Sequence, residues 1–159
     1  MAIYDICFLN GDRAPYNWKI RRNNKTGQVD LYPMFDMAAS FGFAFKPFSN
    51  DEENYYDYVK ARNEELPSYI ISPKSLRNGV QYENYKDFLS YLIQNFTFQT
   101  VNALKKAMTV TSDVLSGILD MIDDVSDERR KFTLDIFAER QKGVNEIINK
   151  YKLEELIKE

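Results

Sequence analysis

The sequence contains no histidine among its 159 residues and a single cysteine, Cys7. Without histidine the chain lacks the commonest general base of enzymes and a common zinc ligand. One cysteine cannot form a disulfide within the chain, and a zinc site built from cysteines is excluded. Any acid–base or metal chemistry therefore falls to carboxylates and amides. Because Cys7 stands in the apolar run 6–9, we expect it to be a small buried residue.

The chain also lacks long apolar runs and a strong excess of charge of either sign. No apolar stretch approaches the roughly 20 residues of a membrane span, and Asp5 interrupts the first one. We therefore expect no signal peptide, no membrane partner and a cytoplasmic location. The formal net charge is −3, so direct binding of nucleic acid is not expected. A hydrophobic fraction of 44% is enough to build the core of a single domain, residues 1–159.

Turn residues and apolar patterns predict a small β element followed by a helical body. Trp18–Arg22 and Gln28–Tyr32 flank the polar, glycine-containing run 23–27, a pattern typical of a β-hairpin. Residues 2–9 fit either a short helix or a strand. From residue 49 to residue 159 the signals are helical, with five or so helices. The predicted fold class is α+β and mostly α, with the hairpin packed on the helical body.

Capping residues and one-sided apolar stripes place the helices of this body. The first helix is predicted to begin at the capping box Ser49–Glu52 and to end near Arg62. Two more are predicted over 83–96 and 100–108. The last two are predicted to begin at Ser112 and at Ser126 or Asp127. In the helix that starts at Ser112, we expect Leu115, Ile118, Leu119 and Ile122 to share one buried face. Gly143 lies inside the last helix, where glycine costs about 1 kcal/mol relative to alanine.

Three polar residues stand out as a candidate site: Asp12, Asn17 and Asp36. Asp12 and Asn17 share one loop, and a hairpin returns the chain to its starting end, so Asp36 can come back near Asn17. Two carboxylates and an amide make an oxygen-rich site that suits Mg²⁺. The spacing D-x-x-x-x-N is also that of the protein-kinase catalytic loop, in which the Asp accepts the substrate hydroxyl proton and the Asn binds metal.

Taken together, Asn10–Trp18, the hairpin and Pro33–Asp36 resemble the catalytic core of HipA-like serine/threonine kinases, a bacterial family. The family pattern is N-x-D-x-H-x-x-N, then a β-hairpin, then P-x-[YF]-D. By this resemblance Asp12 is the general base, and Asn17 and Asp36 bind Mg²⁺ and, through it, ATP. The chain then transfers the ATP γ-phosphate to a Ser or Thr hydroxyl of a protein substrate.

The resemblance also gives a domain organisation and two departures from the family. Residues 10–36 hold the catalytic loop, the hairpin and the metal motif, and residues 49–159 match the helical body of the family's C-terminal lobe. Ala14 stands where the family usually has His. Nothing before Asp12 can supply the glycine-rich loop and strand lysine of an N-terminal lobe. We therefore expect weak ATP binding, little or no activity of the chain alone, and a separate N-lobe or an antitoxin-like protein as a partner.

Several simpler interpretations stay open at this point. Asn10 and Asp12 beside a glycine are ordinary turn formers, and Asp36 can cap a helix that begins near Met37. The chain can then be a degenerate kinase-like lobe that binds proteins, in a toxin–antitoxin or phage setting. The aromatic residues between Phe41 and Tyr58 either form an interaction surface or cover the core, and we expect the second.

Overall fold

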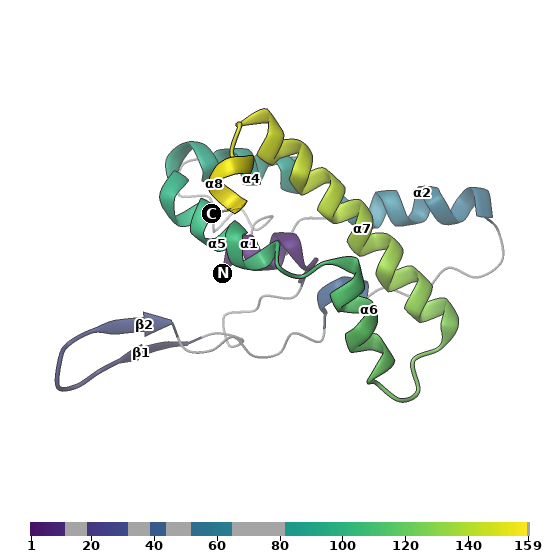
Figure 1. The fold of residues 1–159 in the computed structure, drawn as a ribbon, viewed down its shortest axis with the longest axis horizontal. Helices are drawn as coiled ribbons and strands as arrows, with labels where there is room; N and C mark the ends of the chain where they lie inside the picture. The colour runs from purple at the N-terminus through teal and green to yellow at the C-terminus, as the bar shows by residue number, and fades with distance from the viewer. Residues whose placement is uncertain (12–18, 32–38, 44–51, 65–81, 159) are drawn as a thin grey trace.

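The structure of the chain is a computed structural model that describes residues 1–11, 19–31, 39–43, 52–64 and 82–158. In chain order the elements are α1 (Ala2–Cys7), β1 (Ile20–Arg22), β2 (Val29–Leu31), the 3₁₀ helix η2 (Ser40–Gly42), α2 (Glu52–Asn63), α4 (Tyr85–Asn95), α5 (Thr97–Ala107), α6 (Ser112–Asp120), α7 (Asp127–Lys150) and α8 (Glu154–Lys158). Figure 1 shows a helical body built around α7, with the hairpin extending from one side. The predicted class, α+β and mostly α, is confirmed. Among the described helices, none is both long and apolar enough to span a bilayer.

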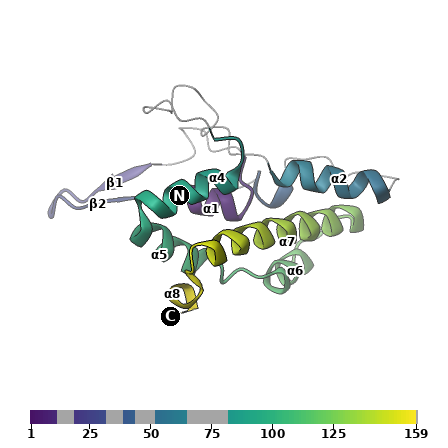
Figure 2. The ribbon, with the colours of Figure 1, turned by 90° about the horizontal axis from the view of Figure 1, so that it is seen from above.

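Helix α7 organises the packing of the body. Its first turn is capped by Ser126, whose side chain accepts a hydrogen bond from the Arg129 backbone N–H at 3.2 Å. Its buried apolar residues recur at helical spacing: Phe132, Ile136, Phe137, Val144, Ile147 and Ile148. The predicted cap and these six residues of the predicted stripe are confirmed, whereas Tyr151, also predicted in the stripe, follows the end of the helix and is half-buried. Figure 2 shows α1, α2 and α4 on one side of α7 and α6 and α8 on the other.

Two helical details differ from the sequence prediction. The cap of α6 is Thr111, whose hydroxyl accepts a hydrogen bond from the Val114 backbone N–H at 3.3 Å, so the cap lies one residue before Ser112. Of the four residues predicted to share a buried face of this helix, Leu115 and Leu119 are buried, but Ile118 and Ile122 are about half exposed. The reason is that α6 packs against α7 along one side, and the described part of the chain covers no wider sector of it.

The predicted hairpin is present in its described part, residues 19–31. Strands β1 and β2 are antiparallel, with Ile20 opposite Leu31 and Arg22 opposite Val29. The Asn23 side chain accepts hydrogen bonds from two backbone N–H groups of the turn, and Gly27 takes a φ of 72°, which favours glycine. These contacts confirm the turn between the two strands.

The position of the hairpin differs from the expected packing on the body. Figures 1 and 2 show it projecting from the helices, and Ile20 and Val29 are 67% and 59% exposed. Three-residue strands with the sequence Ile-Arg-Arg and Val-Asp-Leu offer few apolar side chains to bury. Too little apolar area is therefore available to hold this part of the hairpin against a helix.

The aromatic residues between Phe41 and Tyr58 divide into covered and exposed members. Phe41 packs on Phe8 and Phe137, and Tyr55 is buried against Phe132, as expected of residues that cover the core. Phe43 and Tyr56 are exposed, and Phe45 and Phe48 lie outside the described residues. Cys7 is buried, as predicted.

Gly143 has a packing role that the sequence interpretation missed. It lies where α7 crosses α4, and a Cβ at this position would be 1.8 Å from the Tyr85 hydroxyl oxygen and 2.9 Å from Lys86 Cε. Tyr85 is fully buried, so its ring has little room to move. Glycine at 143 therefore allows α4 and α7 to approach closely, which outweighs its low helix propensity.

We expect Gly143→Ala to lower the free energy of unfolding by about 1–3 kcal/mol, because the added methyl group overpacks the α4–α7 contact. Urea unfolding followed by circular dichroism measures this change. Gly117→Ala is a matched control, since Gly117 is also helical and a Cβ there meets nothing within 4 Å. This control should raise stability by about 0.5–1 kcal/mol. A Gly143→Ala protein as stable as the wild type would show that the helices separate at no cost.

Candidate functional site

The three predicted site residues, Asp12, Asn17 and Asp36, all lie outside the described residues. The described chain on either side of them, however, shows how the site segment is attached to the body. Here the site segment means residues 10–36.

The first end follows directly from the C-terminus of α1. The Asn10 N–H donates to the Asp5 carbonyl oxygen at 2.9 Å, and the Leu9 N–H donates to the Ile6 carbonyl oxygen. This pair of bonds is the Schellman motif, with Leu9 at the left-handed position, φ 52°. Glycine is usual there, and leucine costs about 1–2 kcal/mol in this conformation. Leu9 is nevertheless buried in a cluster with Val59 on α2 and other residues, which holds the turn in place.

Side chains strengthen the same turn. The Asn10 amide nitrogen donates to Asp5 Oδ1 at 3.1 Å, and both side chains are fully buried. Asn10 is the first residue of the kinase-like pattern, so the start of the site segment is fixed to α1. Sequence reasoning treated Asp5 as an interruption of an apolar run and missed this role. The available signal was a carboxylate placed on a short, otherwise apolar stretch five residues before the motif asparagine.

After the site segment, the described chain is again in contact with the end of α1. The Phe41 N–H donates to the Phe8 carbonyl oxygen at 2.6 Å, and the two rings lie 5.3 Å apart, centroid to centroid. Gly42 follows with a φ of 74°, and a Cβ there would be 3.0 Å from Ile136 Cγ2. From α7, the Arg129 guanidinium donates to the Gly42 carbonyl oxygen at 3.2 Å. Residues 40–42 are therefore seated between α1 and α7.

These attachments limit how far the predicted residues can separate. Asp12 lies four residues after Phe8, so fully extended chain would place their Cα atoms at most about 14 Å apart. Asp36 lies five residues before Phe41, which limits that Cα–Cα distance to about 18 Å. The pairing of Ile20 with Leu31 closes the hairpin between them. The topology thus allows all three site residues to converge, which is what the kinase-like arrangement needs.

The hairpin gives the site segment a cluster of positive charge. Lys19, Arg21, Arg22 and Lys25 are all exposed, and all lie within seven residues of sequence. A local excess of cations favours an anionic ligand such as a triphosphate and raises its local concentration.

Among the described residues, no group of three or more His, Cys, Asp or Glu side chains is arranged to hold a metal ion.

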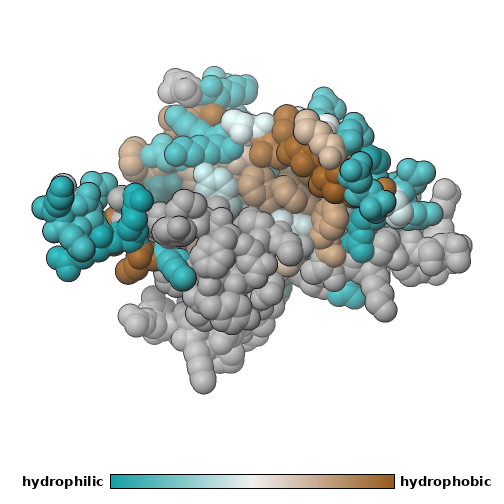
Figure 3. Space-filling view, turned by 90° about the horizontal axis from the view of Figure 1, so that it is seen from below, coloured by the Kyte–Doolittle hydropathy of each residue, from teal (hydrophilic) through white to brown (hydrophobic). Residues whose placement is uncertain are grey.

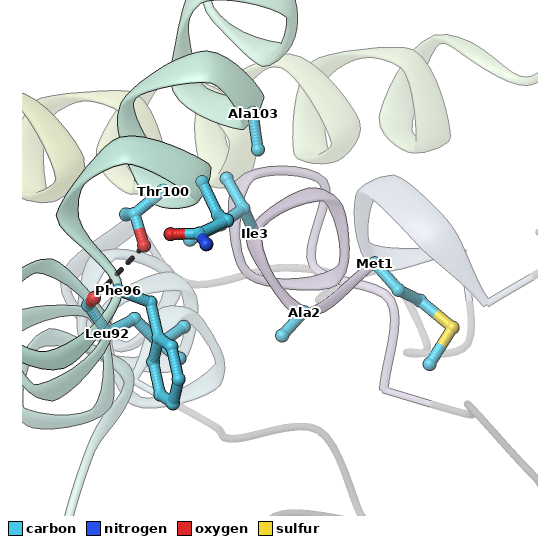
Figure 4. Close-up of a pocket in the computed structure, with 8 residues that line it drawn as sticks. Met1, Ala2, Ile3, Leu92, Phe96, Thr100 and Ala103 are labelled. Carbon is cyan, nitrogen blue, oxygen red and sulfur yellow. Dashed lines mark hydrogen bonds between the residues drawn. The ribbon is translucent and has the colours of Figure 1, made fainter. Parts of the chain in front are cut away.

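Two other features of the described chain are excluded as catalytic sites. Burial raises the pKa of the Cys7 thiol to about 12, although Arg140 nearby opposes the shift, so Cys7 is no thiolate nucleophile at neutral pH. A cavity of about 260 Å³ opens between α1, α4 and α5 (Figure 4). Its lining residues are Met1, Ala2, Ile3, Leu92, Phe96, Gln99, Thr100 and Ala103. None of the lining side chains is a carboxylate, and the Thr100 hydroxyl donates to the Leu92 carbonyl oxygen at 3.0 Å. The lining therefore offers no group for acid–base or metal chemistry.

Comparison with known proteins finds a likeness to solved structures. No family model and no curated protein matches the sequence. The fold is similar to that of the Helicobacter pylori proinflammatory kinase CtkA, with a TM-score of 0.68 and 20% sequence identity. The match covers 94% of this chain and 53% of that kinase, so the chain spans about half the length of the solved structure it matches. At this identity the likeness shows the fold alone: the chain has a kinase-like fold.

Proposed function

We propose that this chain is the half of a HipA-like serine/threonine kinase that carries the general base and the metal ligands. In this proposal Asp12 accepts the proton of the attacking Ser or Thr hydroxyl, and Asn17 and Asp36 hold Mg²⁺ against the phosphates of ATP. Residues 1–159 form one lobe, with the site segment 10–36 attached to the helical body. The likeness of this fold to that of a kinase supports the proposal in general terms.

The observation that carries the proposal is the contact between Phe8 and Phe41. It joins the described residues that flank the site segment, while the hairpin reverses the chain between Ile20 and Leu31. Carboxylate and amide oxygens are the donors that Mg²⁺ prefers, so the residue types fit this ion. When bound, Mg²⁺ neutralises charge on the phosphates, and the cations of the hairpin favour the same polyanion.

A second candidate function is a degenerate kinase-like lobe that binds another protein, as in a toxin–antitoxin or phage setting. The exposure of Ile20 and Val29 on the projecting hairpin favours it, because these side chains lie on the same side of the paired strands. A lobe of this kind needs no metal and no nucleotide. The two functions therefore differ in a measurable property, the binding of ATP.

Calorimetric titration of ATP into the 159-residue chain tests the proposal. We expect weak binding, with a dissociation constant of about 1 mM, in Mg²⁺ and none in EDTA. The affinity is low because these 159 residues match about half of the kinase they resemble, so water screens the contacts of a lobe on its own. We also expect little or no phosphoryl transfer by the chain alone. Equal binding with and without Mg²⁺, or robust autophosphorylation, would contradict this account of the site.

A further inference from the structure

Helix α6 carries an apolar surface that faces solvent. Val114, Ile118, Met121 and Ile122 are 45%, 46%, 82% and 47% exposed, and we call these four residues the α6 stripe. Their spacing of four, three and one residues places them on one side of the helix and its last turn. That turn continues beyond the helix, since the Met121 and Ile122 N–H groups donate to carbonyl oxygens of the preceding turn.

The stripe is distinct from the side of α6 that the core uses. Leu115 and Leu119 are buried with Phe137 of α7 in a cluster of their own, so the core contact of α6 is already made. Figure 3 views the molecule from the α6 side and shows hydrophobic side chains in the open, bordered by hydrophilic ones. A continuous exposed apolar stripe of this kind marks an interaction surface more often than isolated apolar residues do.

The surroundings of the stripe carry negative charge. From Met108 to Glu128 the chain contains six acidic residues and no Lys or Arg. The six are Asp113, Asp120, Asp123, Asp124, Asp127 and Glu128. Asp120 is paired with Arg130 of α7, whereas Asp123 and Asp124 are exposed at the end of the stripe. The rest of the chain, by contrast, is weakly basic in sum, since the total charge is −3.

We propose that the α6 stripe docks an amphipathic, basic helical segment of another protein. Leu- or Ile-type side chains of that segment cover the stripe, and its Lys or Arg residues face the acidic border. The same border disfavours other occupants. A second copy of this chain would set acid against acid, and an anionic membrane or a nucleic acid would be repelled. The proposal concerns a surface separate from the site segment and does not depend on phosphoryl transfer.

Synthetic peptides probe this surface in the complete chain. A helical peptide of leucine and lysine, with all its leucines on one face, is expected to bind and to shift the NMR signals of α6. The same design with glutamate in place of lysine should not bind. Ile118→Ser with Met121→Ser should weaken binding of the lysine peptide about 10-fold or more, as loss of anchor residues does. Because both side chains are exposed, the fold should be retained.

Two further variants separate charge from general stickiness. Asp123→Asn with Asp124→Asn should weaken binding about 3-fold or more and reduce its salt dependence, and Asn tolerates the φ of 65° at position 124. Phe98→Ser is the matched control, since Phe98 is 75% exposed on α5. The affinity of this variant for the lysine peptide should stay within about twofold of the wild type. Equal binding of the glutamate peptide, or an equal loss in Phe98→Ser, would overturn the proposal. So would concentration-dependent dimerisation through α6, or capture by anionic vesicles.

Discussion

Arg140→Met is expected to lower the free energy of unfolding by about 3–5 kcal/mol, a large part of the stability of a domain this size. Arg140 is 1% exposed. Its guanidinium donates to the Ile6 carbonyl oxygen at 3.1 Å, to Asn63 Oδ1 at 2.9 Å and to the Asn63 carbonyl oxygen, and lies 3.8 Å from the centre of the Tyr85 ring. Methionine fills similar space but donates no hydrogen bond, so these buried oxygens lose their charged donor.

The arrangement also explains why a buried cation is tolerated here. The carbonyl oxygens of Ile6 and Asn63 belong to the last turns of α1 and α2, which carry partial negative charge. One side chain of α7 thus joins the C-terminal ends of two helices. Because α1 leads into the site segment through Asn10, loss of this link should also loosen the start of that segment.

Chemical unfolding by urea measures the effect, and Lys142→Met is the control on the exposed side of α7. The control should change stability by less than about 0.5 kcal/mol. Arg140→Lys should fall between the two, because lysine keeps the charge but cannot match the planar fork of donors. If Arg140→Met were as stable as the control, the network would be dispensable and our account of the packing would be wrong.

Asp36→Ala is expected to abolish the Mg²⁺-dependent binding of ATP, whereas Asp12→Ala should leave it largely intact. The two residues are both aspartates in the site segment, but the proposal gives them different tasks. In the proposal Asp36 is a metal ligand, so its removal takes one oxygen donor from the ion. In the same proposal Asp12 accepts the proton of the acceptor hydroxyl, a step that follows binding. With the covering half of a kinase supplied, Asp12→Ala should reduce phosphoryl transfer by about 10²–10⁴-fold.

Calorimetry with the isolated chain compares these variants directly. Glu139→Ala removes an exposed carboxylate from α7 and should bind ATP as the wild type does. The same loss of affinity in Asp12→Ala and Asp36→Ala would show that both bind metal. Unchanged affinity in Asp36→Ala would remove this residue from the site.

Local patterns predicted the helices well because each pattern has a direct physical cause. A serine that accepts a backbone N–H, as Ser126 does, favours the start of a helix, and the stripe of α7 follows from burying one face. The hairpin was likewise visible in its turn residues. The burial of Ile118 and Ile122 was predicted wrongly, because a one-sided stripe does not say how wide a sector its neighbour covers.

Contacts distant in sequence could not be read in the same way. Gly143 was judged by helix propensity, but Tyr85, 58 positions earlier, decides its role. No local pattern marks Asp5 or Arg140, because only the fold buries them beside Asn10, Ile6 and Asn63. For the candidate site, the order of loop, hairpin and metal motif supplied the hypothesis. The described structure adds the contact between Phe8 and Phe41 on either side of the segment, and the roles of Asp12, Asn17 and Asp36 stay predictions.

Paramagnetic broadening by Mn²⁺ tests the central claim, that the site segment forms one metal site for ATP. Mn²⁺ accepts the same oxygen donors as Mg²⁺ and broadens the NMR signals of nearby amides. With ATP present, we predict strong broadening at Gly11, Lys19 and Phe41, little in α8, and loss of the broadening in Asp36→Ala. Broadening confined to the acidic turn at Asp123 and Asp124, or unchanged broadening in Asp36→Ala, would contradict the proposed site.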